Sequence, residues 1–264
     1  MHEPPRFKVA IPARYASTRL PGKPLRTLAG RPLIQHVYDR AVESGAEEVV
    51  IATDDPRIVS AAEAFGARVC MTAPEHPSGT DRLAEVARRL GWKADEIVVN
   101  LQGDEPLMHP DLIRRLATDL ARFGDAEIAT VCTPIHTTAE LFDPHVVKVV
   151  MDKDGYALYF SRAPVPWDRD AFAVTTEELP QGAQHFRHIG LYAYRAGFLE
   201  RYNGLAPCYL ERTESLEQLR ALWSGVRIHV LHSDRPPGHG VDTQDDLERV
   251  ERLLATSQRT PLAD

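Results

Sequence analysis

Short apolar runs alternate with amphipathic segments through the first half of the chain. Five runs are nearly continuous and rich in β-branched residues: 7–11, 48–52, 67–71, 96–101 and 127–132. Such runs are typical of strands that are buried on both faces of a parallel sheet. Helical patterns lie between them, at 32–44, 56–65, 80–90 and 110–122. The alternation predicts a doubly wound α/β layer structure.

The pattern changes after residue 133. Segments 146–152 and 155–162 predict a β-hairpin around Lys153–Gly155, with Asp154-Gly155 as the turn. Further along we expect a strand at 189–194, a helix at 215–224, a strand at 227–231 and a last helix at 243–255 capped by Asp242. The chain shows no repeat and no low-complexity linker. We therefore predict a single domain over 1–264, with a smaller β-rich lobe inserted at about 134–188 and a frayed tail at 256–264.

Composition narrows the class of protein. The 264-residue chain has a net charge of −7, which does not favour a nucleic-acid-binding surface. Its three cysteines are widely spaced and lack metal-ligand spacing, which argues against a disulfide framework or structural zinc. No apolar run reaches the roughly 18–20 residues needed to span a bilayer, and the N-terminus lacks a signal-peptide pattern. We expect a soluble, cytoplasmic protein that does not insert into membranes.

The loop after the first strand is unusually cationic. The stretch AIPARYASTRLPGKPL (10–25) places Arg14, Arg19 and Lys23 on a backbone that prolines and a glycine constrain. In an open α/β sheet, ligands bind outside the carboxyl ends of the strands, where this loop begins. The loop contains neither GxGxxG nor a Walker A pattern, which argues against a dinucleotide or P-loop site.

A phosphate cradle made of side chains is the remaining interpretation of this loop. Arginine grips phosphate oxygens with two donors, and lysine supplies a point charge. The hydroxyls of Ser17 and Thr18 add neutral hydrogen bonds, and the Pro21-Gly22 turn lets Arg19 and Lys23 converge. The alternative is a solvated basic loop, and spacing alone leaves both open.

A second unusual stretch, VVNLQGDEP (98–106), ends a buried strand in two acids. Magnesium commonly uses one or two carboxylates together with substrate phosphates, and Asp104 suits that role. The alternative is a helix N-cap, because Pro106 and a predicted helix follow. Spacing alone favours the cap.

The segment IPARYASTRLPGKPL closely resembles the N-terminal signature of the 3-deoxy-manno-octulosonate (Kdo) cytidylyltransferases, or CMP-Kdo synthetases. Its broader pattern is shared with sugar cytidylyltransferases such as CMP-sialic acid synthetases. The resemblance extends over about 7–255. It implies a nucleotidyltransferase (GT-A-like) fold with a mixed, mostly parallel sheet. It also implies a homodimer, with the inserted lobe on the dimerisation and sugar side.

The resemblance implies transfer of CMP from CTP to the anomeric hydroxyl of Kdo, for bacterial lipopolysaccharide biosynthesis, with Mg²⁺ as cofactor. Carried over by motif, the nucleotide-binding residues are Arg14, Ser17, Arg19, Lys23, Ser78 and Arg82. The catalytic residues are Arg19, Lys23 and Asp104, and the metal ligands are Asp104 and Asp242. The sugar-binding residues are Gln102, Arg162, His188, Tyr192, Glu217 and Gln218. No residue is singled out as a general base.

Several of these residues have ordinary alternatives when they are considered alone. Arg162 suits a surface position after a strand, His188 a structural histidine, and 217–220 a solvated helix face. His239 stands where the family pattern leads us to expect a small residue, next to the loop that carries Asp242. Three other functions remain open: a cytidylyltransferase for amino-Kdo or a sialic-type sugar, a non-catalytic nucleotide-binding module, and a Rossmann oxidoreductase.

Overall fold

A computed structural model describes residues 5–257 apart from 18, 77, 181 and 183. Its central sheet has the strand order β11-β7-β10-β6-β1-β4-β5. These strands are β1 (Phe7–Ala13), β4 (Glu48–Thr53), β5 (Arg68–Met71), β6 (Ile97–Asn100), β7 (Ile128–Pro134), β10 (Phe186–Arg195) and β11 (Ile228–His232). β10 is antiparallel to both of its neighbours in this path, and the other pairs are parallel. The predicted mixed, mostly parallel sheet is confirmed.

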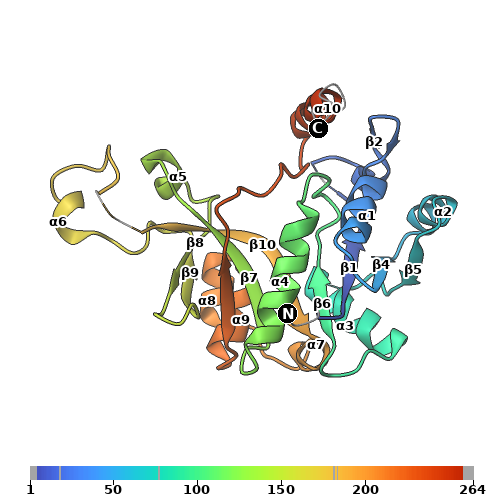
Figure 1. The fold of residues 1–264 in the computed structure, drawn as a ribbon, viewed down its shortest axis with the longest axis horizontal. Helices are drawn as coiled ribbons and strands as arrows, with labels where there is room; N and C mark the ends of the chain where they lie inside the picture. Colours follow the sequence, from blue (N-terminus) through green and yellow to red (C-terminus); the bar gives the residue numbers. More distant parts are fainter. Residues whose placement is uncertain (1–4, 18, 77, 181, 183, 258–264) are drawn as a thin grey trace, which may run out of the picture.

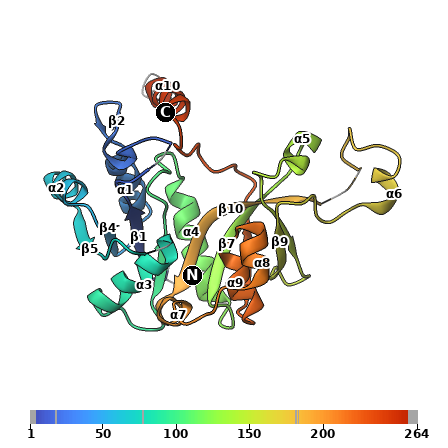
Figure 2. The same cartoon turned by 180° about the vertical axis from the view of Figure 1, so that it is seen from behind.

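Helices cover both faces of the sheet, as a doubly wound fold requires. One face packs against α1 (Leu33–Glu43), α2 (Pro56–Ala64), α4 (Pro110–Arg122) and α10 (Gln244–Ser257). The other packs against α3 (Gly79–Leu90), α7 (Ala196–Tyr202) and α9 (Gln218–Trp223). Alternation along β1 sends Val9 and Ile11 to the first core and Ala10 to the second. Figures 1 and 2 show the two faces in turn.

The segment around 134–188 extends from one end of the sheet (Figure 1). It contains the predicted hairpin, formed by β8 (Lys148–Met151) and β9 (Ala157–Ser161), and the short helices α5 (Thr138–Phe142) and α6 (Arg169–Phe172). A small apolar cluster of Ile135, Leu141, Val146 and Phe172 holds it together. β8 also pairs with β10, so the sheet continues into this segment. Its status as a separate lobe stays a prediction.

Two predicted helix features are wrong in detail. The helix expected at 215–224 begins only at Gln218, because Ser215 has a left-handed backbone (φ 51°) and ends α8 (Tyr209–Glu214). The last helix is not capped by Asp242. Thr243 and Asp246 form a reciprocal cap, in which the Thr243 Oγ1 accepts from the Asp246 N–H at 3.2 Å and the Asp246 Oδ2 accepts from the Thr243 N–H at 3.0 Å.

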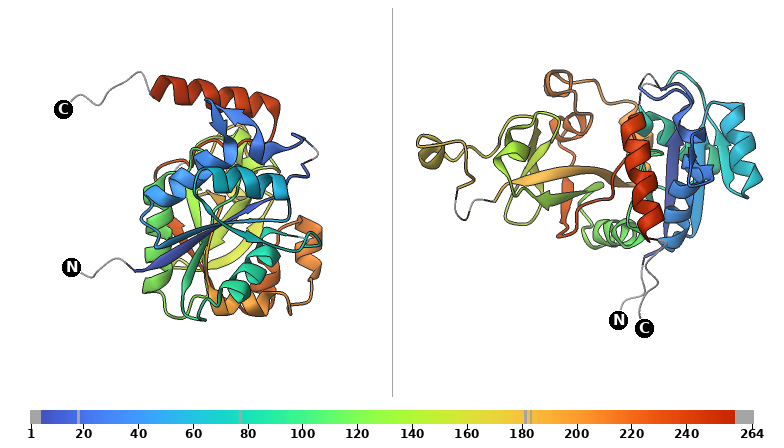
Figure 3. Two further views of the ribbon diagram at one scale, coloured as in Figure 1. Left: turned by 90° about the vertical axis from the view of Figure 1, so that its right-hand side faces the viewer. Right: turned by 90° about the horizontal axis from the view of Figure 1, so that it is seen from above.

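The N-terminal loop continues into a short 3₁₀ helix, η1 (Lys23–Leu25), and a two-stranded ribbon of β2 (Thr27–Leu28) and β3 (Arg31–Pro32). α10 lies beside this ribbon, as the two views of Figure 3 show. Arg26 donates to the Gln244 Oε1 at 3.0 Å, and the Ala29 N–H donates to the Glu251 Oε1 at 3.4 Å. The last helix is therefore tied to the first loop.

Two further predictions concern the cysteines and the ability of the chain to cross a membrane. Cys70, Cys132 and Cys208 are buried free thiols, and burial raises the pKa of Cys132 to about 12. They act as small core side chains. No helix among the described residues combines the length and the apolar character that crossing a membrane demands.

Candidate active site

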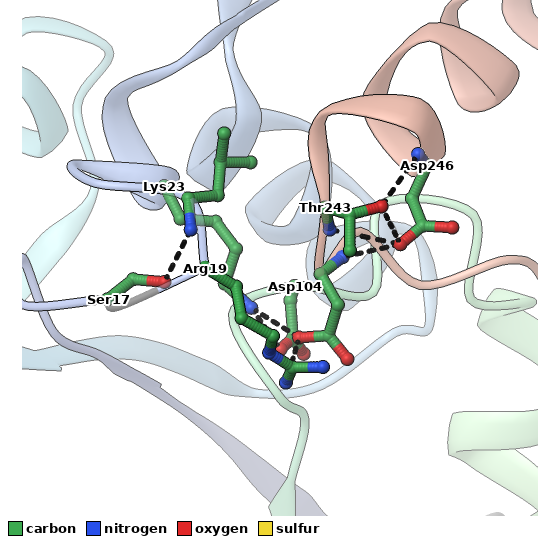
Figure 4. Close-up of polar contacts among 8 residues, drawn as sticks. Ser17, Arg19, Lys23, Asp104, Thr243 and Asp246 are labelled. Carbon is green, nitrogen blue, oxygen red and sulfur yellow. Dashed lines mark hydrogen bonds and ion pairs between the residues drawn. The ribbon is translucent and has the colours of Figure 1, made fainter.

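Four charged side chains from three separate segments meet at the carboxyl ends of β1 and β6. The Lys23 Nζ lies 2.7 Å from the Asp104 Oδ2 and 3.0 Å from the Asp242 Oδ1. The Arg19 Nη2 lies 2.9 Å from the same oxygen of Asp242. Figure 4 shows Arg19 and Lys23 reaching from the N-terminal loop toward Asp104, with Thr243 and Asp246 at the start of the adjoining helix. Two carboxylates and two cations thus form one compact cluster.

Glycines allow these segments to approach so closely. A Cβ on Gly103 would lie 2.8 Å from the carbonyl oxygen of Pro12, at the end of β1. A Cβ on Gly238 would overlap the backbone of Leu107. The loop before α10 is then fixed by the Val241 N–H, which donates to the Asp104 carbonyl at 2.8 Å. This backbone hydrogen bond places Asp242 next to Asp104.

Neither acid of the cluster serves as a helix cap. α4 begins at Pro110 with His109 at its N-cap, well after Asp104. The N-cap alternative for Asp104, which spacing favoured, is therefore wrong. Since Thr243 and Asp246 cap α10, the Asp242 side chain is also left to face the cations.

Charge and burial act against each other in this cluster. Burial by itself would lower the pKa of Lys23, but Asp104 and Asp242 outweigh it, so the pKa of Lys23 is raised. Glu105 is partly buried beside them, and burial of its carboxyl followed by the charges of Asp104 and Asp242 raises its pKa to about 8. Glu105 is therefore mostly protonated at neutral pH, while the two cations Lys23 and Arg19 pair with the other two acids.

The cluster opens into a cavity of about 320 Å³ at the sheet edge. Its lining combines the first loop with the two acidic loops: Pro12, Ala13, Arg14, Ala16, Ser17, Arg19, Lys23, Pro24, Gln102, Gly103, Asp104 and Asp242. The predicted cradle residues Arg14, Ser17, Arg19 and Lys23 therefore share one cavity with both predicted metal ligands. Thr18, which was also expected to contribute a hydroxyl, lies outside the described residues.

The donor set of this cavity suits magnesium bound through a nucleotide. The described residues contain no group of three or more His, Cys, Asp or Glu side chains placed to hold a metal. Asp104 and Asp242 offer two carboxylates that already converge on a cation, the Lys23 ammonium. Magnesium usually takes one or two carboxylates and completes its shell with phosphate oxygens and water. The two acids fit that requirement.

A second cavity, also of about 320 Å³, adjoins the first. It is lined by the start of α3, the ends of β6 and β7, one face of β10, α7 and the α8–α9 connection: Gly79, Thr80, Asn100, Gln102, Ile128, Gly190, Tyr192, Tyr194, Phe198, Tyr202, Ser215, Leu216, Glu217, Gln218 and Ala221. Gln102 lines both cavities. Four predicted sugar-binding residues, Gln102, Tyr192, Glu217 and Gln218, meet here.

Burial shifts the pKa of two titratable groups in the second cavity. Burial raises the pKa of Glu217, and burial also raises the pKa of Tyr192 well above its usual value. The Gln218 Nε2 is buried and has no hydrogen-bond partner among the described residues. An unpaired buried donor is costly, so a ligand acceptor at this point would recover the lost hydrogen bond.

Arg162 and His188 do not appear among the described residues that line either cavity. The Arg162 Nε donates to the Glu214 carbonyl at 2.6 Å, and its Nη1 donates to the Pro144 carbonyl at 2.9 Å. The His188 Nε2 lies 2.9 Å from the Thr130 Oγ1, and its ring packs against Tyr192 at 5.4 Å. Burial lowers the pKa of His188 to about 3, so the ring is neutral. Their sugar-binding roles stay predictions.

Ser78 and Arg82, predicted for the nucleotide, both have partners within the protein. The Ser78 Oγ accepts from the Asp81 N–H at 3.2 Å and so caps the helix. Arg82 is fully buried, with its guanidinium against Thr72 and 3.5 Å from Asp54. Arg14 reaches this region by donating to the His76 carbonyl. Contacts of Ser78 and Arg82 with a nucleotide also stay predictions.

Sequence reasoning missed Asn100, Tyr194 and Tyr202, which line the second cavity. A signal existed for Tyr194, because Gly190, Tyr192 and Tyr194 alternate along β10 and therefore face the same side of the sheet. Tyr202 had no such signal, since α7 brings it in from outside the strand.

The arrangement is that of an α/β protein that binds a nucleotide at one sheet edge beside a second ligand. A model of the family described as Cytidylyltransferase matches residues 9–228. Fold and site therefore define the cytidylyltransferase class.

Curated relatives refine this class. The 3-deoxy-manno-octulosonate cytidylyltransferases of Thioalkalivibrio sulfidiphilus and Pseudomonas fluorescens are each 60% identical over 248 residues, which cover 94% of this chain and 98% of theirs. The chain belongs to the 3-deoxy-manno-octulosonate cytidylyltransferase family.

Solved structures agree with this assignment. A CMP:2-keto-3-deoxy-manno-octonic acid synthetase solved in complex with CTP is 43% identical, with a TM-score of 0.87, covering 96% of this chain and 100% of that one. A cytidylyltransferase from Leptospira borgpetersenii is 16% identical with a TM-score of 0.60, covering 95% of this chain and 87% of that one. The second likeness concerns the fold alone.

Proposed function

We propose that this chain transfers CMP from CTP to the anomeric hydroxyl of Kdo, releasing CMP-Kdo and pyrophosphate. The observation that carries the proposal is that Gln102 lines both the charged and the aromatic cavity. A nucleotide in the first cavity and a sugar in the second would therefore meet at one side chain. The family membership and the CTP complex of the 43% identical enzyme support the same reaction.

In this proposal the first cavity binds the triphosphate. Arg19 and Lys23 are placed to neutralise phosphate oxygens and to stabilise the charge that develops on the departing pyrophosphate. Asp104 and Asp242 would hold Mg²⁺, which, when bound, neutralises phosphate charge. Lys23 is paired with both acids, so phosphate oxygens would compete with these carboxylates for its ammonium group.

The sugar side binds and orients the nucleophile. Tyr192, Glu217 and Gln218 present hydrogen-bond donors and acceptors that suit the hydroxyls of a sugar. Because Gln102 lines both cavities, it would lie between the sugar and the α-phosphorus and align the anomeric hydroxyl for in-line attack. Catalysis by this chain is then mainly positioning and charge neutralisation.

Pyrophosphate release tests the proposal most directly. The full-length protein is incubated with CTP and Mg²⁺ against Kdo, amino-Kdo and a sialic acid. We expect release with Kdo, with a higher kcat/KM than for the other two sugars. A higher kcat/KM for amino-Kdo or for the sialic acid would identify that sugar as the substrate in place of Kdo. CTP binding without pyrophosphate release would indicate a nucleotide-binding module.

A homodimer and a cytoplasmic role in lipopolysaccharide biosynthesis belong to the same proposal. Support for the dimer comes from the segment around 134–188, where Leu158, Trp167 and Val174 are 62%, 53% and 86% exposed. Large exposed apolar side chains gathered on one projection suit a protein interface. Light scattering on the purified protein should give twice the chain mass, and a Trp167→Ser, Val174→Ser variant should approach the mass of one chain.

A further inference from the structure

Arg57 stands at the start of α2 with its guanidinium fixed in place. The Asp55 Oδ1 accepts from the Arg57 N–H and from its Nε, each at 2.9 Å, and the Asp55 Oδ2 accepts from its Nη2 at 2.7 Å. Asp55 is thus both the N-cap of α2 and a two-point clamp on the guanidinium. Such an arrangement orients an exposed arginine that solvent would otherwise leave mobile.

The clamped guanidinium lies over the ring of Tyr15, with its Cζ 3.3 Å from the ring centre. Tyr15 belongs to the first loop, between Arg14 and Ser17 of the charged cavity. Its ring also packs against the core beneath the loop. Arginine over an aromatic face is an attractive contact, and Arg is suited to it by its planar shape.

The hydroxyl end of the same ring lies against Gly22. A Cβ at Gly22 would be 3.2 Å from the Tyr15 Cζ and hydroxyl oxygen, and the Gly22 backbone has a φ of +67°. The Gly22 N–H donates to the Tyr15 carbonyl at 3.3 Å, which closes the loop on itself. The next residue is Lys23, whose ammonium bridges Asp104 and Asp242. The series of contacts from Asp55 to Arg57 and on to Tyr15 therefore reaches Gly22. Gly22 directly precedes Lys23, the lysine proposed to bind phosphate.

We infer that Arg57 and Tyr15 form a positioning pair that holds Tyr15 and Gly22 of the first loop in place before the nucleotide binds. The pair acts through the contact of Tyr15 with Gly22, so neither residue is a catalytic residue. Residues that are already held in place lose less conformational entropy when CTP arrives, and the affinity for CTP rises accordingly. This inference rests on the proposed function only in naming CTP as the nucleotide.

The kinetic test compares Arg57→Ala and Tyr15→Ala with the wild-type protein. A single exposed cation–π contact predicts a rise of about two- to five-fold in the KM for CTP for Arg57→Ala. The KM for Kdo and kcat should stay within about two-fold, because the pair prepares the loop and does not act in the transition state. Tyr15→Phe keeps the aromatic ring and should therefore have the same KM for CTP as the wild-type protein. Arg114→Ala, which breaks an exposed arginine–aspartate pair in α4, is the matched control.

A double variant separates the pair from two independent effects. If Arg57 acts only through Tyr15, the Tyr15→Ala, Arg57→Ala protein should have the same KM for CTP as Tyr15→Ala. If the KM for CTP of the double variant instead rises by the product of the two single-variant factors, the inference is overturned. An unchanged KM for CTP in Arg57→Ala would overturn it as well.

Limited proteolysis tests the loop without any substrate. Trypsin can cut after Arg14 and Arg19, within the loop, whereas Lys23 is protected by the following Pro24. We expect Arg57→Ala and Tyr15→Ala to be cut after Arg19 several times faster than the wild-type and Arg114→Ala proteins. Equal cutting rates would contradict a positioning role. This measurement decides the inference even if the wild-type protein releases no pyrophosphate, an outcome that would count against the proposed function alone.

Discussion

The two cavities that meet at Gln102 treat charge in opposite ways. In the first, Arg19 and Lys23 form ion pairs with Asp104 and Asp242 at the edge of the sheet. In the second, the lining is mainly aromatic and amide side chains, and burial raises the pKa of Glu217 and Tyr192. The difference matches two ligand chemistries, since phosphates and a metal need opposing charges, and sugar hydroxyls need neutral donors and acceptors.

The contrast also explains how each cavity is built. The charged cavity consists mainly of loops, whose backbones converge through glycines and the Val241–Asp104 hydrogen bond. The aromatic cavity stands on β10 and on α7 and α9, which hold large side chains in place. The charged cavity therefore depends on contacts between loops, whereas the shape of the aromatic cavity depends on regular elements.

The largest expected effect comes from the charged cavity. Asp104→Asn keeps the size of the side chain but removes the charge, so we expect kcat/KM in pyrophosphate release to fall about 100- to 1,000-fold. The melting temperature should stay close to that of the wild type, because Asp104 is half-exposed. Asp111→Asn, an exposed acid in the first turn of α4, is the control. Normal turnover of Asp104→Asn would show that the metal assignment is wrong.

Lys23→Met should sharpen the comparison by removing the cation that now bridges the two acids. We expect kcat to fall about 100-fold, through loss of stabilisation of the leaving pyrophosphate. Added Mg²⁺ should raise the melting temperature of the variant more than that of the wild type, since Lys23 no longer competes for Asp104 and Asp242. An identical response to Mg²⁺ in the two proteins would argue against a metal between these acids.

Gln218→Leu addresses the aromatic cavity. Loss of one hydrogen bond to the sugar should raise the KM for Kdo about three- to ten-fold and leave the KM for CTP unchanged. The melting temperature should hold or rise, because the variant no longer buries the unpaired Nε2. Gln35→Leu on α1 serves as the control. A change in the KM for CTP alone would place Gln218 on the nucleotide side.

His188 provides the smallest and most specific test. Burial lowers its pKa from 6.5 to about 3 in the folded chain, so below pH 6.5 the unfolded chain binds a proton that the folded chain does not. Stability due to this group is present above pH 6.5 and is lost as the pH falls toward 3. Between pH 7 and pH 5 the loss amounts to about 2 kcal/mol. Urea unfolding at both pH values should therefore show a smaller loss for His188→Asn than for the wild type.

The exposed His136→Asn variant is the control for this measurement. Its loss of stability between pH 7 and pH 5 should equal that of the wild type, because the His136 side chain is exposed. Equal losses in His188→Asn and wild type would mean that the ring is not shielded as the structure places it.

The sequence by itself determined the local elements and the chemistry of single motifs. Apolar runs predicted the five strands between β1 and β7 that lie in the central sheet, and helix end signals predicted the bounds of α4. Both predictions succeed because the periodicity of apolar residues and the residues that end a helix act between near neighbours in the chain. The resemblance of the first loop then supplied the class of reaction. Spacing alone favoured a helix cap for Asp104, since nothing near it in the chain shows its partners.

Tertiary structure decided which residues meet. Asp242 reaches Asp104 only because glycines let the loop before α10 lie against residues 104–107. Folding also withdrew Arg162 into contacts with two carbonyl groups, and placed Arg57 over Tyr15. The left-handed backbone of Ser215 delays the start of the predicted helix to Gln218. These outcomes depend on contacts between distant segments, which local periodicity does not encode.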